Sequence, residues 1–232
     1  MRNLLLLLLA LLAGAGPAHA AERRYTVTDF DRIVVDGAFE VTLTSGKASS
    51  VVAKGSPAAL DRLSVDVQGR TLRIRPNQSA WGGPMRDDEP GVTIAVGTRG
   101  LRAAAVNGGS RLSLDKVQGL RFDLGLAGSG RITIPSVQVD ALFLNLLGSG
   151  TLELAGRAKT LRAEVRGSGD LEAAGLTVGD ARIFADTAGT TRLVATGSAT
   201  VVATGTGDVE VTGPMACTVK RQGTGRVRCG RA

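Results

Sequence analysis

Three acidic residues, Glu153, Asp170 and Glu172, offer the clearest chemical possibility in this sequence. Carboxylates clustered on one external face could act as general acid and base in glycan cleavage, or could hold a cation weakly. The alternative is a group of exposed charges that water screens and that has no chemical role. A single tryptophan, Trp81, lies in a stretch rich in Gly and Pro. It could stack on a sugar or dock a partner, or its indole could fold back onto the body of the protein. These four residues are the candidate ligand contacts.

Composition excludes most other enzymatic chemistry. The 232 residues include one histidine, His19, in a segment that we expect the mature protein to lose. Hydrolases that depend on a histidine base or ligand are therefore excluded. The Gly-x-Gly turns do not precede helices, and their period differs from that of calcium-binding nonapeptides. We expect no catalytic residue, no metal and no cofactor, and a protein that is not an enzyme.

Residues 1–20 have the pattern of a signal peptide. The basic start Met1-Arg2-Asn3 precedes the apolar stretch Leu4 to Gly14, and Ala18-His19-Ala20 forms a small-residue cleavage box. The apolar stretch is too short to span a bilayer, and no later segment is apolar enough for a transmembrane helix. We expect cleavage after Ala20 and a periplasmic or secreted protein.

The chain is basic, with a formal net charge of +7. This surplus could draw the protein to anionic surfaces such as lipopolysaccharide or acidic glycans. The alternative is an ordinary solvated surface, because no run of five like charges occurs. Aromatic residues make up 3% of the chain, too few for a nucleic-acid stacking platform, so we expect no nucleic-acid partner.

Glycine recurs in an ordered way. Seven short turns share a small, Gly-rich pattern, and they begin near Gly108, Gly128, Gly148, Gly167, Gly189, Gly205 and Gly223. These glycines are 20, 20, 19, 22, 16 and 18 residues apart. A period of about twenty residues is typical of solenoids.

Period-two alternation flanks each turn, which is typical of strands with one buried face. Around Gly148 the inward residues are expected to be Leu142, Leu144, Leu146, Leu152 and Leu154. Such a unit cannot bury its apolar face alone, whereas coils stacked about 4.8 Å apart form parallel ladders around a continuous core. The sequence therefore predicts an all-β protein, a parallel β-helix.

The first third of the domain is less regular. Strands are expected at 33–44, broken at Asp36-Gly37, and at 50–54, 63–67, 71–75 and 92–96, with one helical turn at 57–60. We expect this region to cap the solenoid, which would otherwise present an unpaired edge. The predicted organisation is a lead-in at 21–29 and a single β-helical domain at 30–230.

Alignment of the repeats on their first glycines sorts the outward residues that follow each turn into two columns. The first column reads Arg111, Arg131, Thr151, Asp170, Arg192, Asp208 and Arg226. The second column reads Ser113, Thr133, Glu153, Glu172, Val194, Glu210 and Arg228. The alignment predicts an ion ladder of Asp170, Arg192, Asp208 and Arg226, a Glu210–Arg228 pair, and two neighbouring acids at Glu153 and Glu172.

Two cysteines, Cys217 and Cys229, lie six residues before and six after Gly223. Both then fall in the inward columns of the last coil. Because an exported protein keeps its disulfides, we expect a bridge that staples this coil, rather than a redox site.

The sequence resembles the GIN-domain family, described as auto-transporter adhesin head domains. The resemblance begins at Phe30-Asp31-Arg32-Ile33-Val34-Val35-Asp36-Gly37-Ala38-Phe39, continues through the Gly-Ser-Gly repeats, and reaches Gly223-Thr224-Gly225-Arg226-Val227. It implies an exported β-helix, right-handed as parallel connections usually are. It implies no catalytic residues.

We therefore expect a non-enzymatic cell-envelope module that recognises an unknown surface ligand, with an anionic glycan as one candidate, or that associates with itself through its flat strand faces. The alternative function is a carboxylate-dependent enzyme that resembles the β-helical polysaccharide lyases and hydrolases. An enzyme should hold Glu153, Asp170 and Glu172 together in a groove, whereas a binding module should show paired charges there.

Overall fold

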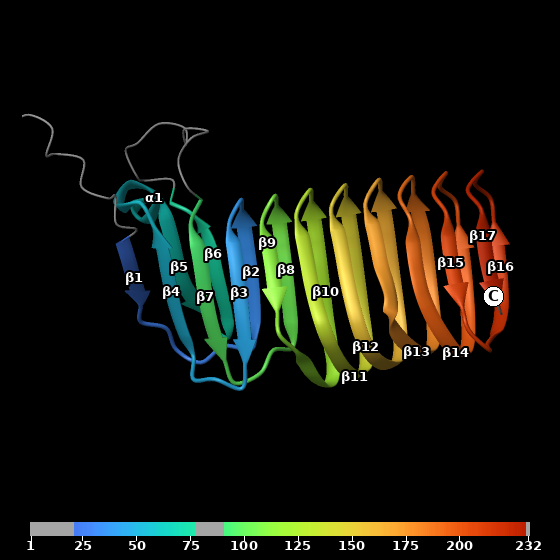
Figure 1. Ribbon diagram of the computed structural model, residues 1–232, viewed down its shortest axis with the longest axis horizontal. Coiled ribbons are helices and arrows are strands. Elements are labelled where there is room, and N and C mark those ends of the chain that lie inside the picture. The colour runs from blue at the N-terminus through green and yellow to red at the C-terminus, as the bar shows by residue number, and fades with distance from the viewer. Residues whose placement is uncertain (1–20, 78–90, 231–232) are drawn as a thin grey trace, which may run out of the picture.

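The computed structural model describes residues 21–77 and 91–230 of the chain (Figure 1). It is an all-β solenoid of about six turns, with 73% of the described residues in strands and 3% in helix. The expected parallel β-helix is confirmed. The candidate contact Trp81 and the expected signal peptide lie outside the described residues. No helix within the described ranges is long and apolar enough to cross a membrane.

Seventeen strands and one short helix make up the described chain. The N-terminal elements are β1 (Ala21–Tyr25), β2 (Arg32–Gly37), β3 (Glu40–Ser45), β4 (Ser50–Gly55), α1 (Pro57–Asp61), β5 (Leu63–Gln68), β6 (Thr71–Pro76) and β7 (Thr93–Thr98). The repeating coils follow as β8 (Ala103–Gly108), β9 (Arg111–Leu114), β10 (Val117–Gly128), β11 (Arg131–Gly148), β12 (Thr151–Gly167), β13 (Asp170–Thr187), β14 (Thr191–Ala203), β15 (Val209–Thr212), β16 (Ala216–Arg221) and β17 (Val227–Gly230).

Each complete coil has two arms that meet at a Gly-rich corner. The arms that follow the corner hydrogen-bond to one another in the order β7, β3, β9, β11, β12, β13, β14, β15 and β17. The arms that precede the corner stack in the order β6, β2, β8, β10, β11, β12, β13, β14 and β16. The solenoid therefore presents two long faces, which Figure 1 shows as parallel rows of arrows.

The corners require glycine because neighbouring coils approach each other closely there. Gly148 has φ +113°, and a Cβ atom on it would lie 2.6 Å from the carbonyl oxygen of Gly128 in the coil before. A side chain would meet both unfavourable backbone conformation and a backbone clash. The corner thus fixes where one arm ends and the next begins.

The core is a continuous stack of aliphatic side chains that point inward from both arms. Leu126, Leu146, Val165, Leu152 and Leu171 are all at most 1% exposed. Their outward neighbours along each strand are intermediate or exposed. The predicted alternation is confirmed in these coils.

The predicted register is wrong at one coil. Gly167 pairs with Thr187, and Gly189 stacks on Gly169, so the corner that we aligned on Gly189 begins two residues earlier. Thr187 replaces the glycine, and its buried hydroxyl donates to the Gly169 carbonyl at 3.2 Å and accepts from the Gly189 amide at 2.9 Å. Since the side-chain period of a strand is two, a slip of two residues preserves the inward face but changes the outward neighbours.

The N-terminal elements close one end of the stack. The coil formed by β2 and β3 does not stack on the next coil in sequence order. It lies between β6 and β7 on one side and β8 and β9 on the other. Beyond it, β4 pairs antiparallel with β7, and β1, the expected lead-in, pairs antiparallel with β4. These antiparallel strands cover the edge of the last parallel coil at this end, so no further coil can stack on it, as expected of a cap.

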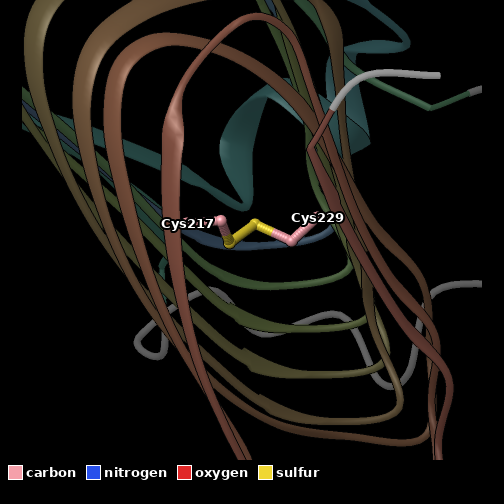
Figure 2. Close-up of a disulfide and its surroundings, with 2 residues drawn as sticks. All are labelled: Cys217 and Cys229. Atoms are coloured by element: carbon pink, nitrogen blue, oxygen red, sulfur yellow. A yellow bond between two sulfur atoms is a disulfide. The ribbon is translucent and has the colours of Figure 1, made fainter.

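The last described coil is stapled by a disulfide. Cys217 on β16 and Cys229 on β17 are bonded across the interior of the coil, with their Cα atoms 6.1 Å apart (Figure 2). Cys217 is in register with the inward Ala199, and Cys229 with the inward Val211. The predicted bridge and its inward placement are confirmed.

Candidate functional site

The three candidate acids lie close together on the arms that follow the corner. Thr151 is in register with Asp170, and Glu153 with Glu172, on the neighbouring strands β12 and β13. Glu153 and Glu172 therefore lie on adjacent rungs, which stack about 4.8 Å apart. Their side chains are 40% and 35% exposed.

Each of the three acids already has a partner. Arg131 on β11 forms an ion pair with Glu153, and the Thr133 hydroxyl donates to the same carboxylate at 3.2 Å. Arg192 on β14 donates to Glu172 at 2.6 Å. The Asp170 carboxylate accepts from the Thr190 backbone amide at 2.7 Å.

These pairs continue along the solenoid as an alternating ladder. Because of the register at Thr187, Arg192 stands beside Glu172 and Glu210, and not in the Asp170 column as we expected. Arg192 lies 3.8 Å from Glu210, and Arg228 lies 3.9 Å from the other oxygen of Glu210. The expected Asp208–Arg226 contact is present at 3.8 Å. The Glu172 carboxylate, with smaller contributions from Glu210 and Asp170, raises the pKa of Arg192 above its ordinary value.

We call this surface the paired face. It comprises the outward residues Thr133, Glu153, Glu172, Arg192, Glu210 and Arg228, with Arg131, Asp170, Asp208 and Arg226 beside them. On this face the carboxylates that glycan cleavage would need are already engaged by arginine side chains or by a backbone amide. Within the described residues, no cluster of three or more His, Cys, Asp or Glu side chains could hold a metal ion.

The charged residues of the opposite face are arranged differently. The outward residues five positions before each corner form one column, which reads Arg32, Ala103, Asp123, Phe143, Arg162, Arg182 and Thr200. The column three positions before each corner reads Val34, Ala105, Gly125, Asn145, Glu164, Phe184 and Val202. We call these two columns, together with Arg73 beside Val34, the arginine face.

Arg162 and Arg182 are direct neighbours in register on this face. The nearest acids along the two columns are engaged elsewhere, because Asp123 pairs with Arg121 at 2.9 Å and Glu164 with Arg166 at 2.5 Å. In the part of the chain that the structure describes, Arg32, Arg73, Arg162 and Arg182 form no ion pair within 4.0 Å.

The arginine face is also hollowed. A depression of about 560 Å³ crosses β6, β2, β8, β10, β11 and β12. Three of the four outward positions on its two central strands hold the small residues Ala103, Ala105 and Gly125, and the fourth holds Asp123, which is paired with Arg121. Arg32 and Arg73 border it on one side, and Phe143 and Arg162 on the other. We call this depression the notch.

Two further hollows adjoin the notch. One of about 400 Å³ shares Arg162 and Glu164 with it and extends over Arg182 and Phe184. The other, of about 920 Å³, shares Arg32, Ala103 and Asp123 and lies at the bend of the N-terminal coils. In this second hollow Asp31 is paired with Arg70 at 2.9 Å, and Asp29 with Arg99 at 2.9 Å.

The arginine face was not predicted, although its signal is present in the sequence. The predicted columns comprise only the outward residues that follow each corner. The same alignment applied five residues before each corner places Arg162 beside Phe143, and the corrected register adds Arg182. The ligand roles of Trp81, Glu153, Asp170 and Glu172 stay predictions.

Comparison with solved structures shows the same fold in several bacterial proteins. A putative adhesin from Bacteroides fragilis superposes with a TM-score of 0.82 at 19% identity, over 90% of this chain and 96% of that one. A putative lipid binding protein from Parabacteroides distasonis gives 0.73 at 21% identity, over 94% and 98% of the two chains. A putative adhesin from Parabacteroides merdae gives 0.69 at 18% identity, again over 94% and 98%.

A comparison with curated protein sequences finds no match. The sequence pattern of one protein family, however, matches residues 29–214, which is most of the chain and includes the arginine face and all of the paired face except Arg226 and Arg228. The expected resemblance is thereby confirmed, and the chain belongs to the family described as "putative auto-transporter adhesin, head GIN domain".

Proposed function

We propose that the protein is a non-enzymatic recognition module of the cell envelope that binds a surface ligand through the outward side chains of its solenoid. The observation that carries this proposal is the pairing of the three acids. Glu153 and Glu172 are held by arginines on neighbouring rungs, and Asp170 by a backbone amide. An acid and base pair for glycosidic cleavage needs one carboxyl group that is protonated and free to reach the leaving oxygen.

Family membership supports the same proposal. The description of the family names an adhesin, and the proteins from Bacteroides fragilis and Parabacteroides merdae are called putative adhesins. Their identity to this chain is below 25%, so the ligand cannot be carried over from them.

The test is a binding screen that also records catalysis. The mature chain, 21–232, is exposed to acidic and neutral envelope glycans, and bound protein and released product are measured together. We expect binding of at least one glycan without product. A triple variant, Glu153→Gln, Asp170→Asn and Glu172→Gln, should bind the same glycan. Product release that this variant abolishes would instead establish the carboxylate-dependent enzyme.

Export is part of the proposal and has its own test. We expect the protein in the periplasmic or extracellular fraction of its host, with Ala21 as the first residue. N-terminal sequencing of the fractionated protein measures this. An intact Met1 in the cytoplasmic fraction would contradict it.

A further inference from the structure

The unpaired arginines of the arginine face are the starting point. Arg162 and Arg182 are register neighbours, so two like charges stand on adjacent rungs about 4.8 Å apart. Like charges directly opposite each other on neighbouring strands destabilise a sheet. On the paired face the same repeat places acids beside its arginines. The fold can thus neutralise stacked arginines, and on this face it does not.

The arginines are arranged around the notch. Its floor of Ala103, Ala105 and Gly125 lies between two raised walls, and arginines stand on both. Three strand spacings separate β2 from β11, so the walls are about 14 Å apart along the solenoid axis. One wall also offers the Phe143 ring, over which the Arg121 guanidinium stacks at 4.1 Å. Aromatic carbon next to guanidinium groups suits a ring that has an apolar side and carries an acid.

We propose that the arginine face binds a linear acidic polysaccharide that lies along the solenoid axis, with a sugar ring in the notch and carboxylates on Arg32, Arg162 and Arg182. The proposal rests on the recognition function above and names its site and its ligand class. The notch and the adjoining hollow over Arg182 and Phe184 together form a track along the arginine face. This track crosses eight neighbouring strands. Arg162 and Arg182 lie one rung apart and Arg32 lies four rungs from Arg162, and a uronic acid polymer carries a carboxylate on every sugar residue that could reach each of them.

Charge and shape favour a glycan over a lipid or a nucleic acid. Leu120, Leu147 and Val219 are the exposed large apolar residues of the described chain, and none lines the notch. The apolar atoms that line the notch come from small or inward-facing side chains such as Ala103, Ala105 and Leu124, and the arginines on both walls favour a ligand that carries negative charge along its length. Two phenylalanines separated along the track, each beneath an arginine, do not form the run of stacking rings that single-stranded nucleic acid uses.

The first experiment removes the charges. Binding of polygalacturonate, alginate and neutral dextran to the mature chain is measured by titration calorimetry at low salt. The double variant Arg162→Gln and Arg182→Gln should weaken binding of an acidic polymer by roughly 30-fold or more, since hydrogen bonds to charged groups are the strong ones. The matched control is Arg111→Gln with Arg157→Gln. Both residues are exposed and lie off this face, and the control changes the net charge equally.

The second experiment fills the notch and leaves the charges in place. Ala105→Leu should raise the floor and weaken binding by roughly tenfold, because ligand contacts there require a close approach. The control is Ala95→Leu, the same change at an outward position of β7 on the other face. Circular dichroism should show the same strand content in both variants.

The outcomes separate this inference from the proposed function. Equal losses in the Arg162/Arg182 variant and its control would mean unspecific attraction and would overturn the inference. Failure of both acidic polymers to bind would also overturn it, while binding of dextran alone would leave the recognition function intact. If an acidic polymer binds through the arginines and is also cleaved, the inference holds and the non-enzymatic function fails. Binding by anionic lipid vesicles but by neither acidic polymer would contradict the ligand class.

Discussion

The two long faces of the solenoid come from the same repeat but use arginine in different ways. On the paired face, Arg192 stands between Glu172 and Glu210, and each arginine of the ladder has an acid on a neighbouring rung. On the arginine face, Arg162 and Arg182 stand next to each other above a floor of small residues. Stacked strands place outward side chains of neighbouring rungs at a short, fixed distance. The signs of the charges on neighbouring rungs therefore determine whether they stabilise or destabilise the sheet. The comparison indicates that the first face stabilises the fold and the second is available to a ligand.

A corner substitution should break both faces together and give the largest effect. Gly148→Val forces a side chain into a backbone with φ +113° and against the Gly128 carbonyl at 2.6 Å. We expect a loss of about 3 kcal/mol or more of unfolding free energy, measured by urea titration. Gly125→Ala is the control, because its Cβ would meet only the Ala105 Cβ at 3.8 Å. This control should be neutral or slightly stabilising, and equal losses at the two positions would refute the role we give to the corners.

Loss of the disulfide should act on one end of both faces. Cys217→Ala with Cys229→Ala opens a loop of 12 residues, which corresponds to about 3 kcal/mol in the chain-entropy account. Because each coil contacts only its neighbours, the effect should stay local. Hydrogen exchange should accelerate in β15, β16 and β17 and remain slow in β11 and β12. Uniform acceleration along the whole chain would show that the coils unfold as one unit.

The smallest effect should separate the two faces directly. Glu153→Gln removes the partner of Arg131 and should lower the unfolding free energy by at most about 1 kcal/mol, since both side chains are partly exposed. Arg162→Gln removes one of two like charges and should leave stability unchanged or raise it slightly. Urea titration of both variants at low salt measures the difference. A larger loss at Arg162 than at Glu153 would mean that the arginine face also stabilises the fold.

Much of the fold was predictable because both its signals are local. The twenty-residue period located the corners, and the alternation of leucines such as Leu142 and Leu144 located the inward face. The stacking of β2 on β8 was not predictable, because the two corners at Gly37 and Gly108 are 71 residues apart and the cap intervenes. A period search finds only neighbours in sequence.

The candidate site was predictable only in part, for a related reason. The alternation of inward and outward residues along a strand predicted that Glu153, Glu172 and Arg192 face outward. A slip of two residues leaves this alternation unchanged, so the alternation does not reveal the slip. The partners of Arg192 depended on Thr187 standing where the other coils have glycine. The hydroxyl satisfies the backbone groups of that corner, which no glycine pattern reveals.

The most direct measurement is a crystal structure of residues 21–232 with an oligogalacturonate. We predict a sugar ring above Ala103, Ala105 and Gly125, with carboxylates against Arg32 and Arg162, and an intact Glu153–Arg131 pair on the other face. A ligand seated on Glu153 and Glu172, with their arginines displaced, would contradict our account and make the paired face the functional site.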